Sequence, residues 1–434
     1  MIPAMTKQTA LDLAAYIDAS PSPYHAVLEA AARLEAADFT RLEEADRWKL
    51  DAGKYYLCRD GSLVAFIVPA DCKPGCGVRV IGAHTDSPNL RIKPNANTGS
   101  AGVRQLGVEV YGGALLNSWL DRDLGLSGRV MVADDETGQR EIAFRFDEPL
   151  LRVPQLAIHL DREINTKGLL LNKQQHMSPM WSLGEREDGG FEQFLEERLG
   201  LEAGSLLGWD AMVHDLTPSR LIGRDEDFLA APRLDNLCSS FVALAALLDV
   251  AAGEDAPETI SMIALFDHEE VGSESATGAA GPLLETIIER TLIAATGSEA
   301  REDFHLSLGA SVCCSADMAH ATHPNYADMH EPDHFLAMNG GPVIKINANL
   351  RYATNSASEV FFQRACERAE VPFQKWVNRT DLACGSTIGS ITAAKLGIMT
   401  VDVGCAQLSM HSAREVCGSE DPGMMRGAMG EFFR

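Results

Sequence analysis

Hydrophobic and polar positions follow two different patterns along the chain, and the change between them marks its organisation. In the first part, apolar residues at helical spacing alternate with short apolar runs bounded by turn residues. This pattern predicts helices over residues 6–18, with Thr6 as N-cap, and over 22–39, a β-hairpin with strands over 55–58 and 63–68, and a buried strand over 78–83. The last of these strands ends at His84.

The middle of the chain, from about residue 95 onward, has a β-rich pattern. Apolar and polar residues alternate in Val108-Glu109-Val110 and again over residues 142–146, glycines are frequent, and polar connectors occupy residues 174–190. A charged stretch over residues 191–199 predicts a helix. This region is therefore expected to form a β-rich domain.

After Arg233 the alternation of strands and helices returns. Strands are predicted over residues 260–266, 306–314, 343–346 and 399–403, and helices over 239–250, 282–292, 359–369 and 386–395. Strands that alternate with helices of this length indicate an α/β domain whose sheet has covered faces. The expected fold is α/β, with a central mixed sheet flanked by helices, formed by residues 1–94 and 231–434 and interrupted by a β-rich insertion over residues 95–230.

The charge balance excludes some partners. The 434 residues contain 37 Lys and Arg against 62 Asp and Glu, which gives a formal net charge of −25. Nucleic acids and anionic membranes are bound by clustered basic residues, so neither is expected as a partner. The most apolar stretch, residues 237–252, is shorter than the ~20 residues that a membrane span requires and predicts a core helix.

The cysteines and the N-terminus favour a cytoplasmic protein. None of the ten cysteines forms a Cys-x-x-Cys pair, which disfavours zinc ribbons and thioredoxin-like sites. Reduced thiols are expected because a chain of this length buries enough apolar surface without disulfides. The N-terminus lacks a basic start followed by a long apolar run, so no secretory signal is predicted.

Residue types that bind metals follow several of the predicted strands. In open α/β sheets, binding sites form beyond the carboxyl ends of the strands. We therefore expect the side chains at these ends to meet in one site. They are His84 and Asp86 after the strand over 78–83, Glu269 and Glu270 after 260–266, Asp317 after 306–314, and His411 after 399–403.

Two of the motifs have both a functional and a structural interpretation. A metal-bound His84 needs an acceptor for its second ring nitrogen, which Asp86 can supply; a surface turn with a solvated Asp is the alternative. Asp235 can bridge two metal ions through its two oxygens, or it can cap the apolar helix that follows.

The adjacent pair Glu269 and Glu270 indicates a metal site more strongly than these two motifs do. Two neighbouring carboxylates repel each other unless a positive charge lies nearby, and a bound metal supplies that charge. One carboxylate can then coordinate the metal while the other takes the proton of a metal-activated water. The alternative is a solvated pair in a loop.

A second cluster lies in residues 317–326, which contain Asp317, His320 and His323. A polar loop with hydrogen-bonded imidazoles is the alternative here. His411 completes a set of imidazole and carboxylate groups without cysteine. Such ligands suit zinc, with manganese or cobalt as alternatives.

Five motifs, at residues 82–88, 232–236, 269–275, 317–326 and 410–412, are together specific. In this order and at this spacing they resemble the aspartyl aminopeptidase family of di-zinc metallo-aminopeptidases, and the resemblance extends over nearly the whole chain. It implies two zinc ions per subunit and a fold in which the insertion mediates dimerisation. The implied metal positions are Asp235 as the bridge, His84 and Asp317 for one ion, and Glu270 and His411 for the other.

The resemblance also implies the catalytic roles and the assembly. Glu269 would be the general base, and Asp86 would orient His84. The subunits would form dimers within a tetrahedral assembly, a dodecamer. His159 is similar to a family histidine that reaches toward a neighbouring subunit's active site, where it would contact substrate; a metal ligand and a core histidine are the alternatives.

The activity implied by the resemblance is removal of the N-terminal residue from peptides, with a preference for Asp and Glu. A net charge of −25 opposes an acidic substrate unless the pocket holds a local cation. Lys345, a charge within an apolar strand, matches a substrate-pocket position of the family, and a plain exposed Lys is the alternative. The other residues expected in the substrate pocket are His320, His323 and Tyr352.

Three other functions remain as alternatives. The enzyme could remove neutral residues or act broadly, which a panel of N-terminal residues would decide. It could be a related di-metal amidohydrolase, which would accept N-blocked substrates. A scaffold without turnover would bind no zinc and hydrolyse no aminoacyl anilide.

Overall fold

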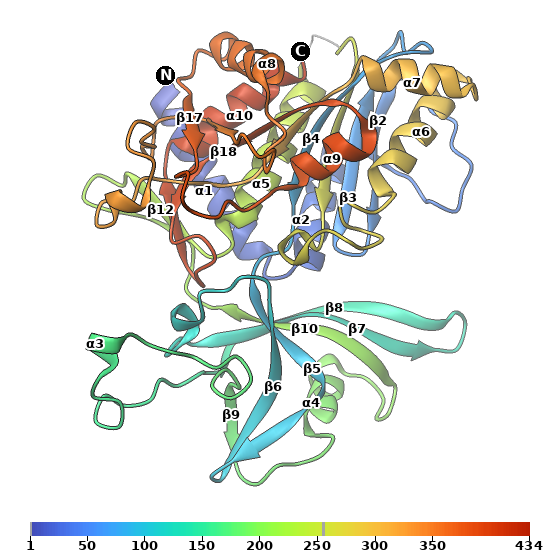
Figure 1. The fold of residues 1–434 in the computed structure, drawn as a ribbon. Coiled ribbons are helices and arrows are strands. Elements are labelled where there is room, and N and C mark those ends of the chain that lie inside the picture. The colour runs from blue at the N-terminus through green and yellow to red at the C-terminus, as the bar shows by residue number, and fades with distance from the viewer. Residues whose placement is uncertain (1, 254–256) are drawn as a thin grey trace. The chain divides into compact units, whose positions relative to one another are not determined.

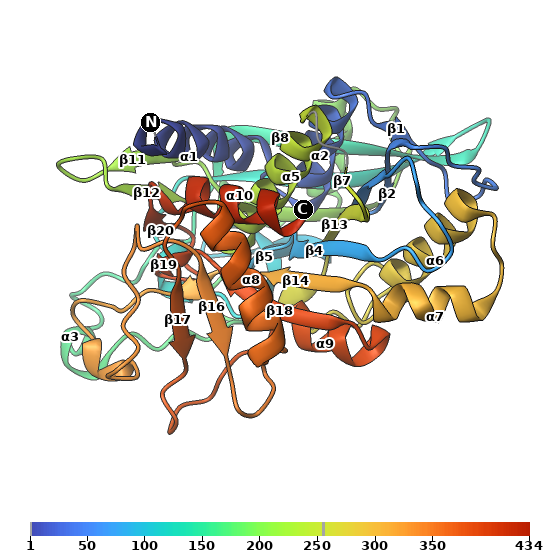
Figure 2. The same ribbon diagram turned by 90° about the horizontal axis from the view of Figure 1, so that it is seen from above.

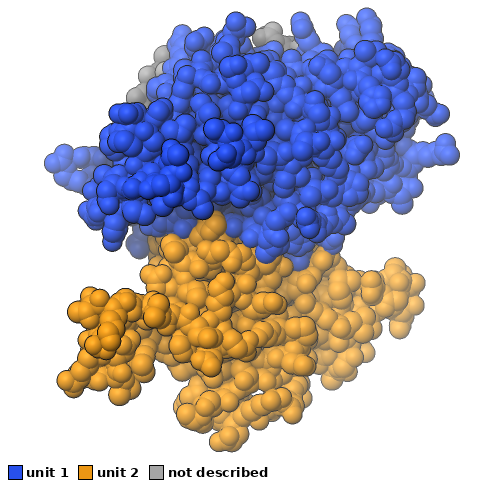
Figure 3. Space-filling model, viewed as in Figure 1, with its two compact units in different colours: residues 1–86, 219–410, 415–434 blue, residues 87–218, 411–414 orange. Residues whose placement is uncertain are grey.

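The computed structural model describes residues 2–253 and 257–434. These residues form two compact units, which are coloured separately in Figure 3. Unit 1 contains residues 1–86, 219–410 and 415–434, and unit 2 contains residues 87–218 and 411–414. The insertion predicted at residues 95–230 overlaps unit 2 over residues 95–218, and four residues of the C-terminal part also belong to unit 2.

Unit 1 is built on a nine-stranded mixed sheet. In spatial order its strands are β1 (Thr40–Arg41), β2 (Gly53–Arg59), β3 (Ser62–Val68), β13 (Ile260–Phe266), β4 (Val78–His84), β14 (Val312–Ala316), β18 (Met399–Gly404), β16 (Val343–Ile346) and β17 (Gln374–Val377). The central strand β4 pairs in parallel with β13 on one side and with β14 on the other. The carboxyl ends of these three strands therefore lie at the same edge of the sheet.

Helices cover both faces of this sheet, as Figure 2 shows from above. One core contains residues of α1 (Ile2–Ala19), α2 (Pro23–Ala36), α5 (Leu234–Ala252), α8 (Ser356–Arg368) and α10 (Asp421–Phe432). The other contains residues of α6 (Leu283–Thr296), α7 (Arg301–Gly309) and α9 (Ile388–Leu396). Successive residues of β3 alternate between the two cores, because side chains along a strand point to opposite faces. A strand that is buried on both faces therefore has a continuous run of apolar residues in the sequence.

Helix α5 is the core helix predicted from the most apolar stretch of the sequence. Among the described residues it is the one helix long and apolar enough to cross a membrane by length and composition, but 83% of its most apolar window is buried inside the protein. It packs against β4, β13 and α10 in the first core. Its hydrophobicity is thus explained by its place in unit 1.

A five-stranded sheet completes unit 1. Its order is β11 (Arg220–Ile222), β12 (Phe228–Ala231), β20 (Glu415–Gly418), β19 (Ala406–Leu408) and β15 (Ala319–His320). Antiparallel pairing places Ala231 of β12 opposite Glu415 of β20. This register brings Glu415 to the start of α5, which follows β12 closely in the chain.

Unit 2 is β-rich, as the sequence pattern predicts. Its six-stranded antiparallel sheet has the order β8 (Gly138–Leu151), β7 (Leu124–Asp134), β10 (Leu206–Asp215), β5 (Asn89–Ser100), β6 (Val103–Tyr111) and β9 (Met180–Leu183). The predicted helix is α4 (Gly190–Leu199), whose Phe191 and Leu195 are buried in the core of the unit. Two short helices also belong to this unit: η1 (Leu116–Trp119), and α3 (Ile164–Lys167), which is labelled in Figure 1.

One predicted element is wrong. Residues 306–314 were expected to form a single strand, but α7 extends to Gly309 and β14 begins only at Val312. The alternation of leucines misleads here, because Leu306 is exposed while Phe304 and Ser307 face the core. Thr6 is also not an N-cap, since α1 already begins at Ile2.

Candidate metal centre

The carboxyl ends of β4, β13 and β14 bring the predicted metal ligands of unit 1 together. His84 is the last residue of β4, and Asp317 follows β14 directly. Glu269 and Glu270 begin a short 3-10 helix, η2 (Glu269–Val271), three residues after β13 ends. Because the three strands are parallel neighbours, residues that are far apart in the sequence meet at one edge.

The imidazole of His84 lies at the middle of this cluster. Its Nε2 atom is 3.4 Å from Oδ1 of Asp235, 3.8 Å from Oε2 of Glu269 and 3.8 Å from Oδ1 of Asp317. The ring is only 1% exposed. One nitrogen thus faces carboxylates from the start of α5, from η2 and from the end of β14.

Two overlapping groups of side chains have the spacing that a metal ion requires. His84, Glu269 and Asp317 form one, and His84, Asp235 and Glu270 form the other; within each, the ligand atoms lie within 4.8 Å of one another. Imidazole nitrogen and carboxylate oxygen are donors that suit zinc. The residues present therefore fit a zinc centre, and both groups share His84.

Asp86 contacts the cluster through Nδ1, the other ring nitrogen of His84. Nδ1 of His84 is 3.3 Å from Oδ1 of Asp86 and 3.0 Å from its carbonyl oxygen. The two oxygens of the same carboxylate accept the backbone N–H groups of Glu269 and Glu270, each at 3.1 Å. Asp86 is fully buried. It therefore fixes the orientation of the imidazole and the position of η2 at once.

The start of α5 is held by contacts that sequence analysis missed. The backbone N–H of Asp235 donates to Oε2 of Glu415 at 3.0 Å, and the Asn236 side chain donates to the carbonyl of Ala316 at 2.8 Å. Ser240 on the same helix donates to the carbonyl of His84 at 2.7 Å. Glu415 lies four residues beyond His411 in the sequence, and this proximity was the one signal that could have identified it.

The electrostatics of the cluster favour a bound cation. Burial raises the pKa of Glu269 to about 8; His84 opposes this effect, and Asp317, Asp235 and Asp86 add to it. Burial alone would lower the pKa of His84, but Glu269, Asp235, Asp317 and Asp86 raise it well above its usual range. Both shifts express the cost of placing several carboxylates together in a poorly solvated site. A divalent cation would relieve this repulsion.

Lys345 of β16 is buried beside the cluster. Its Nζ donates to the carbonyl of Met318 at 3.1 Å and lies 3.7 Å from Oδ2 of Asp317, on the side away from His84. It also lies 5.1 Å from the ring centroid of Tyr352. Lys345 is 2% exposed, so it is not the exposed surface lysine that was the alternative.

The predicted histidines of the 317–326 region lie farther out. His320 is exposed, and its ring lies 5.9 Å from that of Trp376. Nδ1 of His323 accepts the backbone N–H of Asn325, and its ring packs on Tyr326. His323 thus has a local role in shaping the loop, and substrate binding by both histidines stays a prediction.

Two further predicted site residues belong to unit 2. Nδ1 of His411 lies 3.2 Å from the carbonyl oxygen of Gly113 within that unit. His159 is exposed between the exposed side chains of Ile158 and Leu160. The roles of His411 as a metal ligand and of His159 as a substrate contact stay predictions.

Comparison with known proteins gives consistent matches over the chain. Residues 16–433 match the family model described as aminopeptidase I zinc metalloprotease (M18). A probable M18 family aminopeptidase 2 of Streptomyces coelicolor is 50% identical over 425 residues, which cover 98% of this chain and 97% of the relative.

Solved structures agree with this match. A chain in the cryo-EM structure of the Ape4 and Nbr1 complex has a TM-score of 0.94 and 36% identity, and the match covers 99% of this chain and 86% of that one. The mApe1 dodecamer of S. cerevisiae has a TM-score of 0.86 and 29% identity, over 98% of this chain and 96% of that one.

Proposed function

The chain belongs to the M18 family of zinc metalloproteases and is a metallo-aminopeptidase, and from this premise we propose a two-zinc mechanism with a preference for acidic N-terminal residues. The observation that carries the proposal is the position of His84 Nε2 within 3.8 Å of carboxylate oxygens from three different elements. The two ligand groups that share His84 support two neighbouring metal positions.

The proposed ligands follow the roles implied by the sequence. Asp235, which belongs to the group with His84 and Glu270, is the proposed bridging carboxylate. His84 and Asp317 would hold one ion, and Glu270 and His411 would hold the other. Two zinc ions held there would supply Lewis-acid polarisation of the scissile carbonyl and would lower the pKa of a water molecule. Manganese and cobalt accept the same donors.

Glu269 is the proposed general base. Its carboxylate takes a proton from the attacking water and delivers it to the amine that leaves the peptide. The backbone N–H of Glu269 donates to the carboxylate of Asp86, and this hydrogen bond holds the main chain of Glu269 in place at the start of η2.

Lys345 is the proposed source of the acidic preference. It is a buried cation in a protein of net charge −25 and lies at the rim of the metal cluster beside Tyr352. A charge-assisted contact to a substrate carboxylate would discriminate against neutral side chains. Tyr352, His320 and His323 are the proposed neighbours in this pocket.

We propose that the subunits assemble into dimers and a dodecamer in the cytoplasm, as the sequence resemblance implies. The S. cerevisiae relative is described as a dodecamer. In unit 2, the exposed Leu156, Ile158 and Leu160 surround His159. Exposed leucine and isoleucine side chains gathered on one segment are typical of an interface. Burial of this segment against another subunit would carry His159 toward the neighbouring substrate site.

A substrate panel tests the proposed function. The zinc-loaded protein should hydrolyse peptides with N-terminal Asp and Glu with a higher kcat/KM than peptides that begin with Leu, Ala or Lys, and it should not hydrolyse N-acetylated forms. Equal rates for Leu and Asp would reject the acidic preference, and cleavage of N-acetylated substrates would favour an amidohydrolase. Loss of activity on chelation, with recovery on adding zinc, manganese or cobalt, tests the metal dependence.

A further inference from the structure

A buried carboxylate lies on the strand next to Lys345, outside the set of proposed metal ligands. Strands β16 and β18 are antiparallel neighbours, and their register pairs Ile344 with Val403. Both of these side chains belong to the first core. Because successive side chains along a strand point to opposite faces, the same register places Lys345 and Asp402 beside each other on the other face of the sheet. Their exposed fractions are 2% and 0%.

Asp402 holds the segment that carries Tyr352. Oδ2 of Asp402 accepts the backbone N–H of Ala353 at 2.6 Å, and the backbone N–H of Asp402 donates to Oγ1 of Thr354 at 2.9 Å. Oδ1 of the same carboxylate accepts the hydroxyl of Thr387, which is the N-cap of α9. Asp402 thus connects β18 to the two residues that follow Tyr352 and to the start of α9.

The ring of Tyr352 packs close to the charged end of Lys345. Its centroid lies 5.1 Å from Nζ of Lys345 and 5.8 Å from the ring centroid of Trp376. Trp376 of β17 is paired with Lys345 in the sheet, and its ring lies 5.9 Å from that of His320. A shift of the main chain at Ala353 would therefore move an aromatic ring that borders the lysine.

The carboxylate of Asp402 has little room to move. Gly389, in the first turn of α9, lies so close that a Cβ atom at this position would overlap both carboxylate oxygens. Both oxygens act as acceptors, which is the pattern of an ionised carboxylate. Burial raises the pKa of Asp402, while Lys345 and Thr387 oppose this effect. The carboxylate is therefore packed and hydrogen-bonded in one position, from which it can fix its neighbours.

We propose that Asp402 is a positioning residue for substrate specificity, which holds Tyr352 and Lys345 in the relative placement that an acidic N-terminal side chain requires. In the proposed function, on which this proposal rests, Lys345 binds that side chain. Asp402 is fully buried, so it acts through these two residues and not through a contact with the substrate. Its loss should loosen the pocket and leave the metal ligands in place.

Two substitutions disturb Asp402 in different ways. Asp402→Asn keeps the size of the side chain but removes its charge and one of two acceptors. Gly389→Ala keeps the charge and displaces the carboxylate, although Ala is otherwise favoured over Gly within a helix. In both variants the ratio of kcat/KM for N-terminal Asp over Leu should fall roughly tenfold, as expected for a weakened hydrogen bond to a charged group. Zinc affinity should stay unchanged.

The wild-type ratio separates this inference from the proposed function. A wild-type ratio near one would overturn the proposed acidic preference and this inference together. A high wild-type ratio that either variant retains would overturn this inference alone. A loss of zinc affinity in parallel with activity toward both substrates would make Asp402 a support of the metal centre, which also contradicts the proposal.

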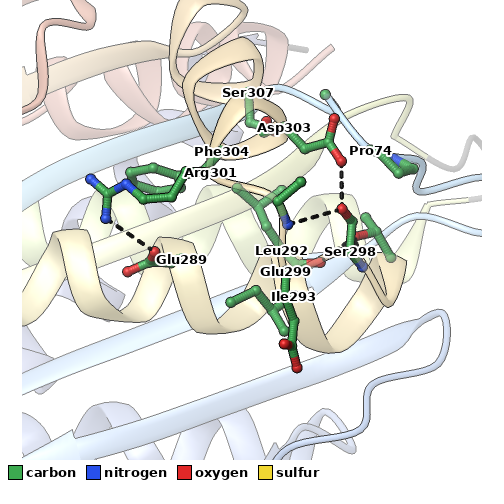
Figure 4. Close-up of a pocket in the computed structure, with 13 residues that line it drawn as sticks. Pro74, Glu289, Leu292, Ile293, Ser298, Glu299, Arg301, Asp303, Phe304 and Ser307 are labelled. Atoms are coloured by element: carbon green, nitrogen blue, oxygen red, sulfur yellow. Dashed lines mark hydrogen bonds and ion pairs between the residues drawn. The ribbon is translucent and has the colours of Figure 1, made fainter.

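Asp303→Asn is the matched control. This half-buried aspartate of α7 also accepts a hydroxyl group, that of Ser298, as Figure 4 shows. It lines a cavity of about 20 Å³ between α6 and α7, which has room for about one water molecule. The variant should keep the wild-type ratio, and thermal unfolding measures the stability that each variant loses. A changed ratio in Asp303→Asn would attribute the effect to lost stability and overturn the proposal.

A double-mutant cycle tests whether Asp402 acts through Lys345. Residues that share an interaction have non-additive effects. In a Lys345→Met background, Asp402→Asn should therefore cause little further fall in the Asp-to-Leu ratio. A full tenfold fall in that background would show that Asp402 acts independently of the lysine, and would overturn the proposal.

Discussion

The carboxylate of Asp86 lies 3.3 Å from Nδ1 of His84, while Nε2 of the same imidazole faces the carboxylates of the metal cluster. This arrangement determines which ring nitrogen is available for a ligand, because the contact to Asp86 favours a proton on Nδ1. The same carboxylate accepts the N–H groups of Glu269 and Glu270. One buried side chain therefore positions groups on both sides of the proposed zinc site.

We expect Asp86→Asn to weaken zinc binding roughly 10- to 100-fold, the usual range for loss of such a partner. The amide keeps the size of the side chain but loses the negative charge and one of two acceptors. Competition with a chromophoric chelator measures the affinity. Asp71→Asn, at an exposed position on the β3–β4 loop, is the control. Unchanged zinc affinity in Asp86→Asn would show that the contact with His84 is dispensable.

The predicted effect of Glu269→Gln is a loss of turnover without a comparable loss of metal. The amide cannot take the proton of the attacking water, so kcat should fall roughly 10²- to 10⁴-fold. Zinc content, measured by atomic emission, should stay near two ions per subunit. The exposed Glu274 in the following loop provides the matched variant Glu274→Gln, which should have wild-type kcat. Retained turnover in Glu269→Gln would assign the base elsewhere, and loss of zinc would make Glu269 a ligand.

The sequence predicts those parts of the site whose position follows from a strand. His84, Glu269 and Asp317 could be predicted to lie together for two reasons. Buried strands are recognised in the sequence as apolar runs, and the polar residues that follow parallel strands lie at the same edge of the sheet. β13 and β16 have the predicted bounds, and β4 extends the predicted run by one residue to His84 itself. The displaced start of β14 did not affect Asp317, since this residue follows the end of the strand.

Contacts between distant segments could not be predicted in this way. Glu415 accepts the N–H of Asp235 across 180 positions of the sequence, through the pairing of β12 with β20. No periodicity encodes the register of two such short strands. Asp86 was predicted as the partner of His84, but its contacts with the backbone of η2 depend on where a loop after β13 returns. Single-sequence patterns contain no information on that path.

A buried acid outside the metal cluster should make stability depend on pH. Burial raises the pKa of Asp421 to about 7, although its carboxylate accepts the N–H groups of Asn339 and Gly341. Because the folded state holds this proton more tightly than the unfolded state, the contribution is fully present below pH 3.8 and is lost as pH rises toward 7. A tenfold difference in proton affinity between the two states corresponds to about 1.4 kcal/mol of stability.

The corresponding experiment compares urea unfolding at several pH values for the wild-type protein and Asp421→Asn. The variant loses one acceptor and should be less stable overall, but the part of the pH dependence between pH 4 and 7 that Asp421 contributes should disappear. Asp249→Asn, at a part-exposed ion pair with Arg426, is the control and should keep the wild-type slope. Identical slopes for wild type and Asp421→Asn would show that Asp421 is ionised throughout this range.

Lys345 gives the sharpest test of specificity, because the structure offers two roles for it. Its Nζ lies 3.7 Å from Oδ2 of Asp317, so it could serve only to hold that carboxylate, or it could also bind an acidic substrate side chain. In Lys345→Met, which keeps the length of the side chain, the ratio of kcat/KM for N-terminal Asp over Leu should fall roughly 10- to 100-fold, as expected for loss of a charged hydrogen bond.

Zinc affinity separates the two roles of Lys345. If the ratio falls while zinc affinity stays within about threefold, the lysine discriminates between substrates. If zinc affinity falls and both substrates lose activity equally, Lys345 acts through Asp317 and the specificity assignment is wrong. Lys375→Met, on the neighbouring strand β17 and exposed, should change neither quantity. The two measurements together separate the roles. A disturbance of Asp317, a proposed metal ligand, would change the zinc affinity. The Asp-to-Leu ratio of kcat/KM does not change when the activity toward both substrates falls equally.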